Sequence, residues 1–111
     1  EILAQCGRLI REMHDLGIWH ADLQARNILI GDAGPWLIDF DKAKRLAAMP
    51  PLLRARNLLR LRRSMGKNGI AMAHFDTLCE GYGMQVTPSW LGGMYDVKGR
   101  ISDWFSGRVD E

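Results

Sequence analysis

The stretch HADLQARNILIGDAGPWLIDFDK, residues 20–42, combines several carboxylates, an asparagine and two short apolar runs. The apolar runs, residues 28–30 and 36–38, are separated by a glycine- and proline-containing segment, residues 31–35. Apolar runs flanking such turn residues are typical of a small antiparallel β-hairpin. Because a hairpin returns the chain to its starting point, we expect the polar residues before the first strand to lie beside those after the second.

Helical patterns surround this hairpin. Residues 2–16 place their apolar side chains on one helical stripe, and Gly17 follows where a left-handed helix cap would lie. After Pro50-Pro51, residues 52–65 predict a second helix, and residues 70–80 predict a weaker third helix that ends near Gly81. The side of the second helix that we expect to be buried consists of Leu52, Ala55, Leu58, Leu59 and Met65. The predicted fold class is α+β, mostly helical with one small hairpin.

The spacing of polar residues around the hairpin indicates phosphoryl transfer. This reaction needs a group that orients and deprotonates the attacking hydroxyl, and oxygen ligands that hold magnesium against the phosphates. The pattern His20-x-Asp22-x4-Asn27, followed by the hairpin and then Asp39, supplies these groups in order. We expect Asp22 to accept the substrate proton, Asn27 and Asp39 to hold Mg²⁺, and His20 to brace the loop by hydrogen bonding.

The same residues resemble the catalytic and metal-binding loops of the protein-kinase-like superfamily. In this resemblance Asp22 matches the catalytic-loop aspartate, Asn27 the metal-binding asparagine and Asp39 the aspartate of the Asp-Phe-Gly motif. The motifs HADLQARNILI, WLIDFDKAK and NLLRLRRSMGK together are similar to the bacterial lipopolysaccharide core kinases that act on 3-deoxy-D-manno-octulosonic acid (Kdo). The resemblance covers roughly residues 1–83. It implies ATP-dependent phosphorylation of a Kdo hydroxyl on Kdo–lipid A.

Three positions depart from the pattern of regulated protein kinases. Ala21 stands where those kinases carry arginine, and Gln24 stands where serine/threonine kinases place lysine. Asp41 replaces the glycine of Asp-Phe-Gly. These departures favour a small-molecule or glycolipid substrate over a protein substrate. We expect Gln24, together with His20, to support the catalytic loop.

A basic block follows the hairpin. From Lys42 to Lys67 the chain has nine lysines and arginines and no acidic residue, within a net charge of only +2. Such a block either seeks an anionic partner or is the solvated side of an ordinary helix. Without aromatic residues to stack on bases, nucleic acid is not favoured. The candidate contacts to an anionic substrate or membrane surface are Arg54, Arg56, Arg60, Arg62, Arg63 and Lys67.

The domain organisation follows from the resemblance. We interpret residues 1–83 as the mainly helical C-terminal lobe of a protein-kinase-like fold and leave residues 84–111 unassigned. The Gly-rich loop, strand lysine and helix glutamate of an N-terminal lobe are expected upstream of Glu1, so residues 1–111 alone should bind ATP poorly and have no useful turnover. The resemblance also implies a peripheral position on the cytoplasmic face of the bacterial inner membrane. The sequence does not indicate an oligomeric state.

Two alternative functions stay open. One is another small-molecule kinase, such as an aminoglycoside or choline phosphotransferase, although we would not expect the basic helix there. The other is a non-catalytic pseudokinase lobe that docks on a membrane, which the presence of Asp22, Asn27 and Asp39 disfavours. Cys6 and Cys79 lack the spacing of a metal site, and we expect both to be small buried apolar side chains.

Overall fold

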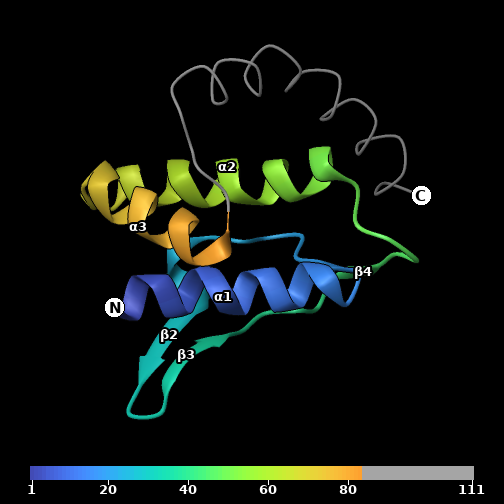
Figure 1. Ribbon diagram of the computed structural model, residues 1–111, viewed down its shortest axis with the longest axis horizontal. Helices are drawn as coiled ribbons and strands as arrows, with labels where there is room; N and C mark the ends of the chain where they lie inside the picture. The colour runs from blue at the N-terminus through green and yellow to red at the C-terminus, as the bar shows by residue number, and fades with distance from the viewer. Residues whose placement is uncertain (84–111) are drawn as a thin grey trace.

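The described part of the chain, residues 1–83 of a computed structural model, consists of three helices and two small antiparallel sheets. This arrangement confirms the α+β class. Residues 84–111, which the sequence left unassigned, lie outside the described residues. Figure 1 shows α1 and α2 crossing the molecule one below the other, with α3 beside them at one end and the β2–β3 hairpin projecting beyond α1. In order, the elements are α1 (Ile2–Asp15), β1 (Ile18–Trp19), the 3-10 turn η1 (Ala25–Asn27), β2 (Ile28–Gly31), β3 (Gly34–Leu37), β4 (Lys44–Arg45), α2 (Pro51–Lys67) and α3 (Met72–Tyr82).

Helices α1 and α3 pack backbone against backbone. A Cβ atom on Gly7 would lie 1.9 Å from the Leu78 carbonyl oxygen, and one on Gly81 would lie 2.1 Å from the Ala4 carbonyl oxygen. Helix α3 ends at Tyr82, so the prediction that the third helix ends near Gly81 is confirmed. Gly81 itself is a helical contact residue, and the left-handed cap that follows the helix is Gly83, with a φ of 95°.

Helix α2 begins at Pro51, where the missing N–H of proline leaves no helical hydrogen bond unmade. Four of the side chains expected to be buried are buried, but Leu52 is 47% exposed and that prediction is wrong. Leu53 is buried instead, because the first turn of α2 packs on a small second cluster with Trp19 and Met49 rather than on the main core.

The hairpin of β2 and β3 is confirmed, with a tighter turn than expected. Gly31 pairs with Gly34, so only Asp32 and Ala33 form the loop, and Ile38 lies just after the strand. Ile28 and Leu37 pack against the main core. The large apolar side chains of this region that are exposed among the described residues are Leu29, Ile30, Trp36, Ile38 and Phe40.

A second sheet was not predicted. The short strand β1 pairs with β4, with Ile18 opposite Arg45, and the Leu46 N–H donates to the Gly17 carbonyl at 2.7 Å. This pairing folds the segment after Asp39 back onto the beginning of the loop that carries Asp22. It therefore helps to place the two predicted site segments side by side.

The main core lies between the three helices and contains both cysteines. Cys6 and Cys79 are buried free thiols, as expected, and burial raises the pKa of Cys79 to about 12. A thiol with so high a pKa is unreactive at neutral pH, so its role is packing. Within residues 1–83, no helix is long and apolar enough to span a membrane.

Candidate active site

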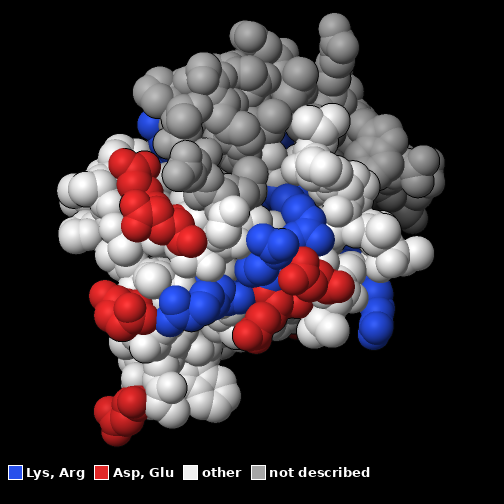
Figure 2. Space-filling model, viewed as in Figure 1, with Lys and Arg blue, Asp and Glu red and all other residues white. Residues whose placement is uncertain are grey.

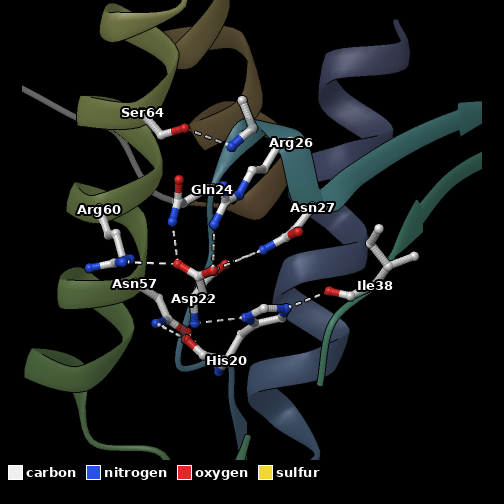
Figure 3. Close-up of polar contacts among 10 residues, drawn as sticks. His20, Asp22, Gln24, Arg26, Asn27, Ile38, Asn57, Arg60 and Ser64 are labelled. Carbon is white, nitrogen blue, oxygen red and sulfur yellow. Dashed lines mark hydrogen bonds and ion pairs between the residues drawn. The ribbon is translucent and has the colours of Figure 1, made fainter. Parts of the chain in front are cut away.

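His20 fixes the loop that carries Asp22. Its imidazole is buried, accepts the Asp22 N–H at Nδ1 (3.0 Å) and donates from Nε2 to the Ile38 carbonyl (2.8 Å). The Phe40 ring lies 4.9 Å from it, centroid to centroid. One neutral imidazole thus connects the backbone of Asp22 to the residue preceding Asp39, as the close-up of the site shows (Figure 3).

Helix α2 holds His20 through Asn57, which is fully buried. The Asn57 amide donates to the His20 carbonyl at 2.8 Å, and its Oδ1 accepts the His20 N–H at 3.2 Å (Figure 3). The same oxygen accepts the Nε2–H of His14 at 2.9 Å. Asn57 therefore satisfies three buried polar groups at once and joins α1, α2 and the loop.

The network continues from His14 to the end of α3. The Tyr82 hydroxyl donates to His14 Nδ1 at 2.7 Å and accepts from the Arg54 guanidinium at 3.1 Å. This direction of donation requires a neutral His14. Burial lowers the pKa of His14 to about 4, which keeps the imidazole neutral at physiological pH.

Asp22 is surrounded by hydrogen-bond donors. Its Oδ1 accepts from Arg60 Nη2 at 2.9 Å and from the Gln24 amide, and its Oδ2 accepts from Arg26 at 3.3 Å (Figure 3). The hydrogen bond from Arg60, and then that from Gln24, lowers the pKa of Asp22 to about 2. The carboxylate is therefore ionised throughout the physiological pH range and is held in one orientation.

Asp39 lies across a cavity from Asp22. Both carboxylates line a cavity of about 440 Å³, together with Gln24, Arg60 and other side chains. Asp39 is exposed and its φ is 67°, a left-handed conformation that is uncommon for residues other than glycine, although aspartate adopts it more readily than most. Such a conformation is kept where the surroundings impose it, and it clusters at functional sites.

Asn27 does not line this cavity. It is buried, and its amide nitrogen donates to the Asp22 carbonyl at 2.7 Å, which leaves its amide oxygen as the group that could bind a metal. The structure thus joins Asn27 to Asp22 by hydrogen bonds, and Asp39 lines the same cavity as Asp22, but within residues 1–83 no hydrogen bond joins Asn27 to Asp39.

The oxygen donors fit magnesium better than a softer metal. Within residues 1–83 there is no group of three or more histidine, cysteine or acidic side chains that could hold a metal ion. Magnesium does not need one, since it commonly takes one or two protein oxygens and completes its octahedron with phosphates and water. The groups that would hold the magnesium ion are the Asp39 carboxylate and the Asn27 amide oxygen.

The six cations named from the sequence do not share one environment. Arg54 is engaged internally, with Asp15 at 3.0 Å, the Tyr82 hydroxyl and the Met49 carbonyl. Arg60 binds Asp22, whereas Arg56 and Arg62 are half-buried and have contacts of their own. On the face viewed in Figure 2, basic and acidic side chains are interspersed among the described residues. The remaining two cations, Arg63 and Lys67, line a separate cavity.

Sequence reasoning missed three residues that organise the site. Arg26 pairs with Asp22, Asn57 clamps His20, and the Ser64 hydroxyl accepts the Ala25 N–H at 2.8 Å (Figure 3). Asn57 did leave a signal, because an asparagine flanked by leucine and arginine on a helix must have buried partners if it faces the core. Ser64 carries the same kind of signal more weakly.

The fold and the site together are compatible with part of a kinase-like phosphotransferase. A family model described as "Lipopolysaccharide kinase (Kdo/WaaP) family" matches residues 1–82. The chain therefore belongs to the lipopolysaccharide kinase (Kdo/WaaP) family, and the resemblance inferred from the motifs is confirmed.

Curated relatives agree with this assignment. A 3-deoxy-D-manno-octulosonic acid kinase of Haemophilus influenzae is 48% identical over 71 residues, covering 60% of this chain and 29% of that protein. Proteins of the same name from Photobacterium profundum and Xylella fastidiosa are each 43% identical, over 83 and 86 residues, covering 68% and 70% of this chain and 34% of each relative. The chain spans about a third of the length of these relatives.

Proposed function

We propose that the protein phosphorylates a Kdo hydroxyl on Kdo–lipid A with ATP, in the synthesis of the lipopolysaccharide inner core. The observation that carries this proposal is the Asp22 carboxylate, ionised and held by three side chains, facing a cavity that it shares with Asp39. The family match and the names of the relatives supply the acceptor.

Asp22 would position the acceptor hydroxyl for attack. With a pKa of about 2, its carboxylate is a weak base but a permanently available hydrogen-bond acceptor. This suits phosphoryl transfer, in which the transition state is loose and the hydroxyl proton leaves late. The hydrogen bond that the Asp22 N–H donates to His20 and the one that the Asp22 carbonyl accepts from Asn27 would keep the carboxylate aimed at the cavity.

Asp39 and Asn27 would hold Mg²⁺. When bound, the metal would neutralise charge on the phosphates of ATP. Asp39 is suited to this because no ion-pair partner within residues 1–83 engages its carboxylate. His20 would set its position through the hydrogen bond to the carbonyl of the preceding residue.

Residues 1–83 would form part of the C-terminal lobe of the kinase. The exposed apolar side chains of the hairpin, Leu29, Ile30 and Trp36 among them, support this proposal because a nucleotide base or an N-terminal lobe could cover them. A lobe without its partner should have no useful turnover.

The protein would act as a peripheral protein on the cytoplasmic face of the inner membrane. A basic side chain near an anionic membrane contributes about 1 kcal/mol of binding. Arg63 and Lys67 support such a position, because they are exposed and make no ion pair within residues 1–83.

The test uses the complete protein, labelled ATP and Kdo–lipid A. We expect phosphate transfer to the glycolipid, and we expect Asp22→Asn to lower kcat by about 10³-fold, within the range for loss of a general base. Asp32→Asn, at the exposed tip of the hairpin, is the matched control and should leave kcat unchanged. Transfer to choline or an aminoglycoside instead of Kdo–lipid A would contradict the proposal, and so would an Asp22→Asn variant with normal kcat.

A further inference from the structure

A second cavity lies on the other side of Arg60. It has a volume of about 130 Å³ and is lined by Gln24, Arg60, Arg63, Ser64 and Lys67. Three of these side chains are cationic and none is acidic. A small cavity with this lining is suited to a single anionic group rather than to a whole sugar.

The positive charge of this cavity is largely uncompensated. Arg60, Arg63 and Lys67 follow one another at three- and four-residue spacing on α2, which places like charges on neighbouring helical positions. Within residues 1–83, Arg63 and Lys67 make no ion pair. Burial, together with the charges of Arg60 and Arg63, lowers the pKa of nearby Arg56. An anionic ligand would relieve this repulsion.

The cavity also offers a neutral donor. The Ser64 hydroxyl accepts the Ala25 N–H at 2.8 Å, so its own hydrogen remains available to a ligand. Because the same bond ties Ser64 to the catalytic loop, the cavity and the loop are fixed relative to each other.

The cavity adjoins the reaction site directly. Gln24 and Arg60 line both cavities, and Arg60 Nη2 lies 2.9 Å from Asp22 Oδ1. A ligand group bound by Arg63 and Lys67 would therefore be separated from the Asp22 carboxylate only by these two side chains. A molecule carrying both an anionic group and a hydroxyl could occupy both places.

We propose that Arg63, Lys67 and Ser64, with Arg60, bind a carboxylate or phosphate group of the acceptor and so present its hydroxyl to Asp22. This inference rests on the proposed function and adds an acceptor subsite to it. Arg60 then serves both cavities, since it orients Asp22 on one side and adds charge to the subsite on the other.

The test compares the complete wild-type protein with the Arg63→Gln/Lys67→Gln double variant, in neutral detergent micelles that exclude membrane attraction. We expect the KM for Kdo–lipid A to rise at least about tenfold, which corresponds to about 1.4 kcal/mol of lost binding. The KM for ATP and kcat should stay within about twofold. Arg45→Gln, an exposed cation on β4 outside both cavities, is the matched control and should leave all three constants unchanged.

The source of the anion is identified with altered acceptors. Kdo–lipid A without its lipid A phosphates, and Kdo–lipid A with its Kdo carboxyl groups esterified, are compared with the intact acceptor. The acceptor that lacks the recognised group should bind wild type and the double variant equally. An unchanged acceptor KM, or an equal rise in the KM for ATP, would overturn the inference. Loss of binding to phosphatidylglycerol vesicles alone, with unchanged acceptor KM, would also overturn it.

A direct binding measurement separates this inference from the proposed function. Inorganic phosphate is titrated into the complete protein by calorimetry, which requires no turnover. We expect the double variant to bind phosphate at least about tenfold more weakly than wild type and Arg45→Gln. If no acceptor is phosphorylated but this difference is found, the proposed function fails and the anion subsite stands. Equal phosphate binding would reject the subsite whatever the activity.

Discussion

Replacing Asn57 by alanine should weaken the attachment of α2 to the loop that carries Asp22. Asn57 makes three hydrogen bonds that other residues cannot replace, to His14 Nε2 at 2.9 Å, to the His20 N–H at 3.2 Å and to the His20 carbonyl at 2.8 Å. His14, His20 and Asn57 are all fully buried. Truncation would leave two donors and one acceptor without a protein partner.

The size of the effect follows from these three groups. A buried polar group that loses its partner costs about 1–3 kcal/mol, and neighbouring losses are only partly additive. We therefore expect the free energy of unfolding to fall by about 3–5 kcal/mol. This is a large fraction of the roughly 5–15 kcal/mol that stabilises a typical domain. Asn57→Leu, which keeps the branched shape and the number of side-chain heavy atoms, should lose a similar amount because the loss is polar.

The assay is urea unfolding of the complete protein, combined with hydrogen exchange of a peptide covering residues 18–24. Both Asn57 variants should lower the urea midpoint and speed exchange at the His20 amide. Asn68→Ala is the matched control, because Asn68 is exposed, lies at the end of the same helix and makes one local bond to the Ser64 carbonyl. Equal midpoints for Asn57→Ala and Asn68→Ala would refute the role assigned to the network.

Three further predictions concern pH, packing and metal. Because burial lowers the pKa of His14 from 6.5 to about 4, the folded protein favours the neutral imidazole. The free energy of unfolding should therefore be greatest above pH 6.5 and fall by about 3 kcal/mol towards pH 4. In urea unfolding measured over this pH range, His14→Gln should remove this pH dependence. Gly81→Ala should lower the Tm strongly, because the added Cβ would lie 2.1 Å from the Ala4 carbonyl oxygen. Gly66→Ala should leave the Tm nearly unchanged, because its Cβ would meet only the Met72 Cε, at 3.8 Å. Equal Tm values for the two variants would contradict the close packing of α1 and α3. Asp39→Asn should raise the Mg²⁺ concentration needed for half-maximal transfer at least about tenfold, and an unchanged Mg²⁺ titration would exclude Asp39 as a ligand.

The features that sequence reasoning predicted are those set by local patterns. The hairpin follows from two apolar runs around a turn, and the first helix follows from a stripe that ends before Gly17. The positions of His20, Asp22 and Asp39 around the hairpin required only that a hairpin returns the chain. The error in the second helix is correspondingly local: Leu52 was expected to be buried, but the first turn of α2 packs on Trp19 and Met49 through Leu53 instead.

The features that sequence reasoning missed depend on contacts distant along the chain. The pairing of β1 with β4 has no apolar pattern to reveal it, since Lys44 and Arg45 are both exposed. Arg54, named from the sequence among the candidate contacts to an anionic substrate or membrane, pairs with Asp15 because the start of α2 meets the end of α1 there. A run of charged residues in the sequence does not show which of its side chains can contact a partner. That depends on how the helix packs against the rest of the protein.

Arg60, on α2, supplies Asp22 with a cation that the neutral Gln24 in the loop does not. Gln24 is neutral at a position where serine/threonine kinases place lysine, yet Asp22 still receives a guanidinium from the helix, that of Arg60. Helix α2 reaches the loop through Asn57, Arg60 and Ser64, which are spaced three and four residues apart and contact successive parts of residues 20–25. This polar stripe, more than the net charge of the basic block, is the signal that α2 belongs to the site. In the proposed subsite, a substrate group that engages Arg60 would also act on the carboxylate that Arg60 holds, so acceptor binding and the orientation of Asp22 would be coupled.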